Sequence, residues 1–357
     1  MLGTPDGLCD SEPTFASWTE TVLPMLSHGS PPHVPQSGDP QSPGNAADQA
    51  LLAVGVWLRG EAYAFVTPSP ATHARVNARA VGRAATRLQD VFGWSRPFQP
   101  GFLPPFIVDL LGVADALENG VASLRSKVRF SSLSGLLFAH SAYPTTDHDA
   151  VFFGPDTYRF ARLIEHSLKR TGAAAPDTWL VDVGCGSGAG GIVASRLGYG
   201  YRPMLCDISD KALHFSWVNC ALAGVADARL RNSDVLKAVD EPVSIIVANP
   251  PYLLDAEGRL YRDGGGEWGS ALSTRILAEG LEQLMPGGQM ILYTGVPIIN
   301  GCDLFRASVK DILRTHAAAV SYEEIDPDVF GEELERDAYA GVERIAVVAL
   351  VVTKRAD

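Results

Sequence analysis

The chain has 357 residues, 46% of them hydrophobic, and a formal net charge of -12 from 41 acidic and 29 basic side chains. This composition is typical of a globular protein with a substantial core, and the length suffices for two ordinary domains or one extended domain. The acidic balance argues against binding to long stretches of nucleic-acid backbone, because each phosphate contact needs a lysine or an arginine. It does not exclude contact with a structured RNA through a local basic patch.

The cysteines and the apolar segments indicate the cellular compartment in which the protein is expected. The cysteines are Cys9, Cys185, Cys206, Cys220 and Cys302. Their number is odd and they have no zinc-ligand spacing, so we expect reduced, mostly buried thiols and no metal site. No lysine or arginine precedes Arg59, so the positive start of a secretory signal is missing, and apolar runs such as 345–352 are far shorter than a membrane span. We therefore expect a soluble cytoplasmic protein without a membrane segment.

The first 150 residues are predicted to form three units. Residues 1–45 are rich in proline, serine and glycine, which predicts a mostly disordered tail. Residues 46–122 show helical periodicity in three stretches, which predicts a small helical domain. Residues 123–150 alternate around Ser134 and Gly135, which predicts a β-hairpin linker. The three helical stretches are 47–58, 71–92 and 105–117.

Residues 151–357 are predicted to form an α/β domain. Asp156 and Thr157 are expected to cap a helix that runs to Lys169. From Thr178 onward, strands and helices alternate as they do in a parallel sheet. We expect seven strands, the last of them antiparallel. The strands are expected at 179–183, 203–206, 228–230, 243–248, 289–294, 320–325 and 344–352, and the helices at 190–197, 210–223, 270–284 and 303–316.

A glycine-rich turn follows the first of these strands. Gly184, Gly186 and Gly188 lead from the strand into a helix, and glycine lets the backbone of a helix N-terminus approach a phosphate or carboxylate. Dinucleotide-binding folds carry the related pattern Gly-x-Gly-x-x-Gly. The pattern here is Gly-x-Gly-x-Gly after Asp182, which favours S-adenosylmethionine, because an acidic residue at the strand end can hold its amino group. A tight turn without a ligand is the alternative.

Polar residues follow the next two strands. Asp207 comes directly after the second strand, where a carboxylate can accept hydrogen bonds from two ribose hydroxyls. It is equally typical of the first turn of a helix. Ser233 and Asp234 follow the third strand, where a polar side chain can reach the adenine amino group. A plain turn is the alternative for this pair.

The tetrapeptide Asn249-Pro250-Pro251-Tyr252 ends the fourth strand, at the edge where open α/β sheets bind ligands. The Asn249 side-chain oxygen and the Pro250 carbonyl can accept both N–H bonds of an amino or amide nitrogen and turn it toward tetrahedral geometry. The prolines fix these acceptors in advance, which is the pre-organisation that catalysis needs. Tyr252 offers a flat face to a planar amide or base. A rigid proline turn without chemistry is the alternative.

These motifs resemble class I S-adenosylmethionine-dependent methyltransferases of the amino-methylating kind. They look most like the release-factor glutamine N5-methyltransferase family and its ribosomal-protein and small-domain relatives. The resemblance covers roughly residues 125–353 and is also carried by residues 152–157, 263–266 and 342–345 and by Arg275. It implies a seven-stranded Rossmann-like sheet behind a helical domain that helps to choose the substrate. It also implies that Asn249 and Pro250 hold the substrate amide.

The chain departs from that family at two points, and the acceptor stays open. Gly154 stands where the family has an arginine, and the loop 253–269 is lengthened and ends in Glu267 and Trp268. The resemblance favours a protein glutamine in a translation factor or ribosomal protein as the acceptor. The alternatives are an amino group of an RNA base and a small metabolite of a biosynthetic pathway. A cofactor-binding scaffold without turnover is the non-enzymatic alternative.

Overall fold

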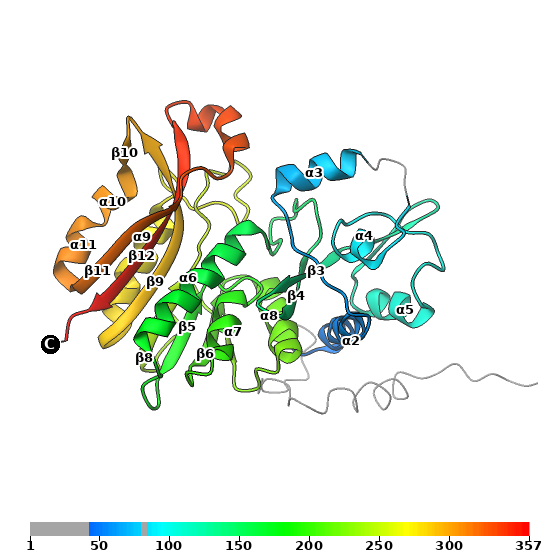
Figure 1. The fold of residues 1–357 in the computed structure, drawn as a ribbon, viewed down its shortest axis with the longest axis horizontal. Coiled ribbons are helices and arrows are strands. Elements are labelled where there is room, and N and C mark those ends of the chain that lie inside the picture. Colours follow the sequence, from blue (N-terminus) through cyan, green and yellow to red (C-terminus); the bar gives the residue numbers. More distant parts are fainter. Residues whose placement is uncertain (1–42, 80–83, 357) are drawn as a thin grey trace, which may run out of the picture.

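The computed structural model describes residues 43–79 and 84–356. The predicted tail, apart from its last three residues, lies outside the described residues. Figure 1 shows an α/β part built on one large sheet, with the N-terminal elements α2 to α5 beside it. Among the described residues, no helix is both long and apolar enough to cross a membrane.

The central sheet is mixed, and its strand order is β11-β12-β9-β8-β5-β6-β7. Strands β5 to β9 run parallel, and β12 lies antiparallel between β9 and β11. Each predicted strand has a counterpart, but a short additional strand, β10, pairs with β9 and makes the sheet eight-stranded. The strands are β5 (Trp179–Val183), β6 (Arg202–Asp207), β7 (Arg229–Asn232), β8 (Val243–Ala248), β9 (Leu284–Ile299), β10 (Cys302–Asp303), β11 (Ala317–Asp326) and β12 (Arg344–Lys354).

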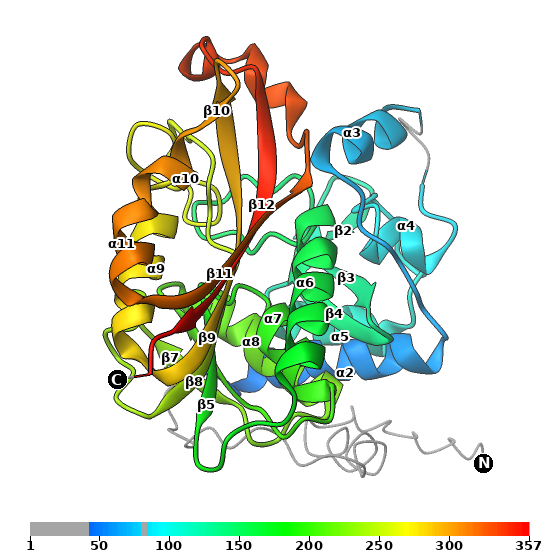
Figure 2. The same cartoon turned by 60° about the vertical axis from the view of Figure 1, so that its left-hand side comes forward.

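Helices cover both faces of this sheet, as Figure 2 shows. On strand β5, Val181 packs with the helix α9 side and Leu180 with the helix α6 side, because successive side chains of a strand point to opposite faces. The predicted helix 303–316 is divided in two, since it restarts after Val309. The elements are α6 (Pro155–Thr171), α7 (Ala189–Arg196), α8 (Asp210–Ala223), α9 (Ala271–Gln283), α10 (Leu304–Ser308), α11 (Lys310–His316) and the 3-10 turns η2 (Gly331–Glu335) and η3 (Asp337–Tyr339).

The N-terminal part is less helical than its periodicity predicts. The single helix expected over 71–92 is wrong: one helix ends at Ala78 and another begins at Leu88. The second helix starts anew because the Asp90 carboxylate accepts hydrogen bonds from the backbone N–H groups of Thr86 and Arg87. The elements are α2 (Ala46–Gly60), α3 (Pro70–Ala78), α4 (Leu88–Phe92), α5 (Pro105–Val113), β1 (Leu117–Asn119), β2 (Leu124–Ser126), β3 (Val128–Leu133) and β4 (Leu136–Ser141).

Helix α2 packs directly on helix α8 of the α/β part. A Cβ atom at Gly55 would lie 2.8 Å from the Leu222 side chain, and the Arg59 guanidinium donates to the Leu222 carbonyl at 2.7 Å. Buried side chains of α2, α4, α5, the β3–β4 hairpin and α8 form one cluster. The N-terminal elements therefore share a core with the α/β part, and the domain boundaries at residues 122 and 150 stay predictions.

Candidate active site

A cavity of about 720 Å³ opens at the carboxyl ends of strands β5, β6 and β8. Ligands of open α/β sheets bind at this edge, and ligand pockets have volumes of about 300–1,000 Å³. The predicted site residues meet here: Asp182, Gly184, Gly186, Asp207, Ser233, Asp234, Asn249, Pro250 and Tyr252 all line the cavity. Gly188 belongs to the same turn but does not line the cavity; it is the residue that precedes helix α7.

The glycine turn is shaped by its backbone. Gly184 and Gly186 have φ angles of 66° and 54°, in the left-handed region that other residues rarely adopt. A Cβ atom at Gly184 would meet no atom within 4 Å, so the turn faces open space rather than packed side chains. The backbone N–H groups of Gly184 and Cys185 both donate to the Cys206 carbonyl and fasten the turn to β6. Space for a ligand is thus left directly above the turn.

The carboxylate of Asp182 is buried beneath the glycine turn. Its side chain is buried, and Oδ2 accepts a 2.8 Å hydrogen bond from the backbone N–H of Gly191 in helix α7. Burial raises the pKa of this carboxyl to about 7, against the opposing effect of the hydrogen bond. Asp182 therefore holds the start of α7 against β5, and its contact with a cofactor amino group stays a prediction.

Asp207 ends strand β6 and points to the rim of the turn. Its Oδ2 accepts from the Gly186 N–H at 2.9 Å, and its Oδ1 accepts from the Ser209 N–H at 2.9 Å. Burial raises the pKa of Asp207 despite these hydrogen bonds. Each carboxylate oxygen can accept a further hydrogen bond, so both remain able to meet ribose hydroxyls. The contact itself stays a prediction.

The side chains of Ser233 and Asp234 make different contacts. The Ser233 hydroxyl accepts from the backbone N–H of Ala238 at 3.1 Å, as in a capping turn. Asp234 is held by two cations, with Oδ1 at 2.6 Å from Arg275 and Oδ2 at 2.6 Å from Lys237. These partners lower the pKa of Asp234 to about 2, Arg275 first. Its carboxylate is therefore already paired, and its contact with adenine stays a prediction.

Asn249 follows the last residue of β8 and is half-buried at the cavity wall. Across residues 43–79 and 84–356, no hydrogen bond to its side chain is present. Pro250 next to it is buried, and Pro251 is half-buried. The backbone of Asn249 is thus held in place by the prolines that follow, while its side-chain amide has no partner in the described residues. Such a side chain can accept a hydrogen bond from the N–H group of a ligand.

Tyr252 is anchored in the protein more firmly than expected. Its hydroxyl donates to Asp156 Oδ2 at 2.7 Å, and Tyr293 donates to Oδ1 of the same carboxylate at 2.7 Å. A Cβ atom at Gly295 would lie 2.1 Å from the Tyr252 ring, so one side of the ring is packed against backbone. The predicted flat-face contact with the acceptor stays a prediction, and the observed role of Tyr252 is to fix the tetrapeptide.

The capping role expected of Asp156 is wrong. The residue that precedes helix α6 is Gly154, and Asp156 lies in the first turn with a buried carboxylate. Burial raises its pKa, while the two tyrosine hydroxyls and Arg159 oppose the rise. Sequence reasoning missed the Asp156–Tyr293 contact because an acid at a helix start already has a common local explanation.

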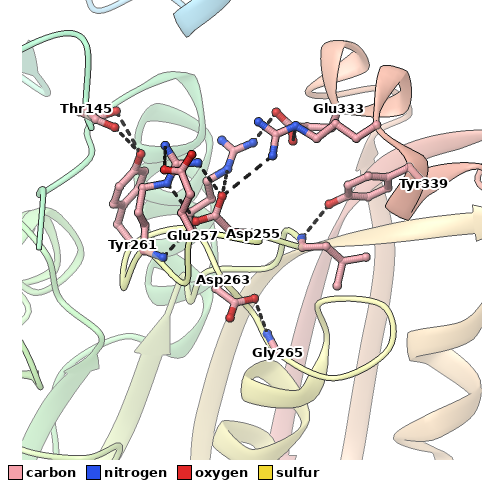
Figure 3. Close-up of polar contacts among 12 residues, drawn as sticks. Thr145, Asp255, Glu257, Tyr261, Asp263, Gly265, Glu333 and Tyr339 are labelled. Carbon is pink, nitrogen blue, oxygen red and sulfur yellow. Dashed lines mark hydrogen bonds and ion pairs between the residues drawn. The ribbon is translucent and has the colours of Figure 1, made fainter. Parts of the chain in front are cut away.

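A second group that sequence reasoning missed comes from the lengthened loop 253–269. Figure 3 shows Asp255 on this loop facing Glu333 of η2, with arginine side chains between them. Tyr261 on the other side of the loop donates to the Thr145 carbonyl at 2.7 Å. The alternation of acids and arginines over 255–263 was the available signal, but nothing in it indicated the distant partner on η2.

Comparisons with known proteins agree with this geometry. Residues 161–295 match the family model described as methyltransferase small domain. A release factor glutamine methyltransferase of Deinococcus radiodurans is 29% identical over 188 residues, which cover 50% of this chain and 64% of that protein. A ribosomal protein L11 methyltransferase of Lactobacillus johnsonii is 34% identical over 97 residues, 27% of this chain and 30% of that protein. The chain thus spans less than two thirds of the length of these relatives.

Among solved structures, the chain is similar to a tRNA m1G37 methyltransferase of M. jannaschii, with a TM-score of 0.44, 15% identity and coverage of 66% of this chain and 59% of that one. The match over 161–295 spans the glycine turn, Asp207 and the tetrapeptide. Residues 161–295 are thus similar in sequence to a methyltransferase small domain. The cofactor of the protein is S-adenosylmethionine.

The residues present suit that cofactor. The open space above Gly184, the carboxylate of Asp207 beside it and the free amide of Asn249 lie along one cavity. Asp207 and the turn would hold the nucleoside, and Asn249 would face the methyl acceptor. Among the described residues, no group of three or more histidine, cysteine, aspartate or glutamate side chains is placed to hold a metal ion.

Proposed function

We propose that the protein transfers a methyl group from S-adenosylmethionine to an amide nitrogen, with a glutamine side chain of another protein as the acceptor. The proposal rests mainly on Asn249, whose side chain lines the cavity and has no hydrogen-bond partner in the described part of the chain. The next residue, Pro250, supplies a carbonyl on a backbone that proline makes rigid. Two fixed acceptors side by side match the two N–H bonds of a primary amide.

The chemical task of these acceptors is to free a lone pair. An amide nitrogen is a weak nucleophile because its lone pair is shared with the carbonyl. Hydrogen bonds to Asn249 and to the Pro250 carbonyl hold the nitrogen turned out of the amide plane. When bound, S-adenosylmethionine would supply a methyl group on a positively charged sulfur: the nitrogen lone pair would form the N–C bond as the S–C bond breaks, and S-adenosylhomocysteine would leave as a neutral thioether. The methylated nitrogen would then lose one proton to water, so the acceptor needs no base before transfer. The rigid tetrapeptide thus contributes by proximity and by pre-organised polar groups.

The choice of a protein acceptor rests on the relatives and on charge. The relatives' names refer to a release factor and to ribosomal protein L11, so a translation factor or a ribosomal protein is the expected partner. An amino group of an RNA base fits the same tetrapeptide, but the net charge of -12 disfavours it. A small metabolite is the remaining enzymatic alternative, because the lengthened loop alters the acceptor side.

The test is a transfer assay with radiolabelled S-adenosylmethionine and fractionated cell extract. We expect label in the protein fraction, and we expect Asn249→Ala to lower the rate about 100- to 1,000-fold, as the loss of a pre-organised polar contact does. Cofactor affinity, measured by calorimetry, should be largely kept in this variant. Label in RNA or in small molecules would move the acceptor to those classes. An Asn249→Ala rate equal to the wild-type rate would contradict the proposed chemistry.

A further inference from the structure

Residues 254–262 form a strap that crosses the cavity and is tied to the protein on both sides, as Figure 3 shows. The base of the strap lies beside the tetrapeptide, because the backbone N–H of Leu253 donates to the Arg262 carbonyl at 3.1 Å. From this base the strap contacts η2 on one side and the segment 145–152 on the other. Residues of both segments line the cavity, so the strap spans it.

The side of the strap that contacts η2 is held by buried charges. Asp255, whose side chain is 1% exposed, accepts from Arg259 at 2.9 Å and 2.5 Å and lies 3.2 Å from Nε of Arg262. Arg262 pairs in turn with Glu333 of η2. Separating these groups would leave buried charges without partners, which is costly. We therefore expect this side of the strap to stay attached.

The opposite side is held by neutral groups. The Tyr261 hydroxyl donates to the Thr145 carbonyl at 2.7 Å, and the Leu260 N–H donates to the His148 carbonyl at 3.0 Å. The Tyr261 ring stacks on the Phe152 ring, with centroids 6.0 Å apart and planes 14° apart. Water can replace both hydrogen bonds at a small net cost, so this is the side that can detach.

Gly154 makes room for this stack. A Cβ atom at Gly154 would lie 2.5 Å from the Phe152 ring, so the ring rests on the Gly154 backbone. The φ angle of Gly154 is -159°, which any residue adopts, so space for Phe152 rather than backbone strain requires the glycine. The two departures from the resembled family, Gly154 and the lengthened loop, are thus linked through Phe152.

The detachable side of the strap lies near the end of strand β6. Lys211 of helix α8, four residues after Asp207, pairs with Asp147 at 3.4 Å and with Asp149 at 3.1 Å. These two acids flank His148, whose carbonyl holds the strap. The strap is thereby fastened beside the carboxylate that is predicted to hold the ribose.

Apolar surface is exposed within this part of the cavity. Leu260 on the strap lines the cavity and is 38% exposed. Ile208, directly after Asp207, also lines the cavity and is 56% exposed. Apolar surface left exposed in a groove marks a ligand that covers it. The flat, largely apolar ring system of a nucleoside has the chemistry to do so.

We propose that the strap clamps the cofactor: Leu260 packs on the nucleoside of S-adenosylmethionine, and Tyr261 fastens the strap over it. The proposal rests on the cofactor site of the proposed function and not on its acceptor. Removal of apolar surface from water favours the contact at Leu260. Entry and exit of the cofactor require the Tyr261 side to detach, as the lids of other enzymes do.

The test measures binding of S-adenosylhomocysteine and of adenosine to the immobilised full chain by surface plasmon resonance. Association rates, dissociation rates and Kd are compared among the wild type, Leu260→Ala and Tyr261→Phe. The matched control is Glu257→Gln on the same strap, since the Glu257 side chain is 70% exposed and lies 3.5 Å from Arg259. Leu260 is partly exposed, so its truncation leaves no cavity in a packed core.

The two variants should change different constants. Leu260→Ala removes a contact that exists only with ligand bound, so the dissociation rate and Kd of both ligands should rise about tenfold at an unchanged association rate. Tyr261→Phe weakens the closed strap with and without ligand. Both rates should then rise about three- to tenfold, while Kd changes less than about twofold. Glu257→Gln should match the wild type.

Two results would overturn the clamp while leaving methyl transfer in place. One is a wild-type dissociation rate in Leu260→Ala, which would show that this side chain does not touch the nucleoside. The other is a pair of wild-type rates in Tyr261→Phe, which would show that the strap does not detach at Thr145. A wild-type protein that binds no S-adenosylhomocysteine would contradict the cofactor site itself, and both the clamp and the proposed function with it.

Discussion

The hydroxyl of Tyr252 donates a 2.7 Å hydrogen bond to the buried carboxylate of Asp156, so the tetrapeptide after β8 is tied to the first turn of helix α6. The second oxygen of the same carboxylate accepts from Tyr293 on strand β9. One buried acid thus joins three elements directly beneath the site. The position of Asn249 and Pro250 depends on this junction, because Tyr252 is two residues away from Pro250.

Tyr252→Phe should lower the rate of transfer about tenfold and leave cofactor affinity unchanged. The variant keeps the ring and removes only the hydroxyl, so Asp156 loses one of its two tyrosine partners. A buried carboxyl that loses a hydrogen bond costs about 1–3 kcal/mol of stability, which urea unfolding can measure. The assay is kcat at saturating cofactor beside calorimetric titration of S-adenosylhomocysteine. Wild-type kcat together with wild-type stability would show that the junction does not support the site.

Gly295→Ala should disturb the site without touching the cofactor. A Cβ atom at Gly295 would lie 2.1 Å from the Tyr252 ring, so the ring must shift and take the tetrapeptide with it. We expect a loss of stability of about 1–3 kcal/mol from overpacking and a fall in kcat of at least tenfold. The matched control is Gly112→Ala in helix α5, where an added Cβ meets no atom within 4 Å. An active, stable Gly295→Ala protein would show that Tyr252 can move freely.

Much of this architecture follows from local patterns. The glycine turn, the strand before it and Asp207 at the end of β6 could be predicted because each depends on a few neighbouring residues. Strand β5 is buried on both faces, as expected for a strand covered by helices on each side. The helix 71–92 was mispredicted for a physical reason: a continuous apolar period does not reveal that Asp90 accepts from the backbone of Thr86 and Arg87.

The parts of the site that could not be predicted depend on contacts between distant segments. Asp156 and Tyr252 are far apart in sequence, and nothing around either residue indicates the other. The same holds for Arg262 and Glu333, which meet only because both segments pack beside the tetrapeptide. The ion pair of Asp234 with Arg275 also joins segments that are distant along the chain, and the contact of Asp234 with the cofactor stays a prediction.

Asp207→Ala should weaken cofactor binding far more than Asp234→Ala. Asp207 fixes the Gly186 and Ser209 N–H groups at the rim of the turn and keeps lone pairs for ribose hydroxyls. Loss of a charged hydrogen-bonding group costs about 1.5–3 kcal/mol, or about ten- to a hundredfold in Kd. Asp234 is paired with two cations at the surface, so its removal should change Kd less than about threefold, the scale of an exposed ion pair. Calorimetry measures the cofactor Kd of both variants. Equal increases in Kd would contradict the assignment of Asp207 to the ribose.

Asp182 predicts a pH dependence of stability. Its pKa rises from the ordinary 3.8 to about 7 in the folded protein, chiefly because of burial. Below pH 4 the carboxyl is protonated in both the folded and the unfolded chain and has no effect. Between about pH 4 and pH 7 the unfolded chain releases this proton more readily, so the free energy of unfolding should fall as pH rises, by up to about 1.4 kcal/mol per unit.

Asp182→Asn should remove this dependence. The amide is uncharged at every pH, and its oxygen can still accept from the Gly191 N–H as Oδ2 does at 2.8 Å. Burial also raises the pKa values of Asp156 and Asp207, so the wild-type curve contains their contributions in the same direction. The informative quantity is therefore the difference between the two proteins, measured by urea unfolding from pH 4 to pH 8. We expect the variant to gain stability relative to the wild type as pH rises toward 7, and a constant difference would show that Asp182 ionises normally in the folded protein.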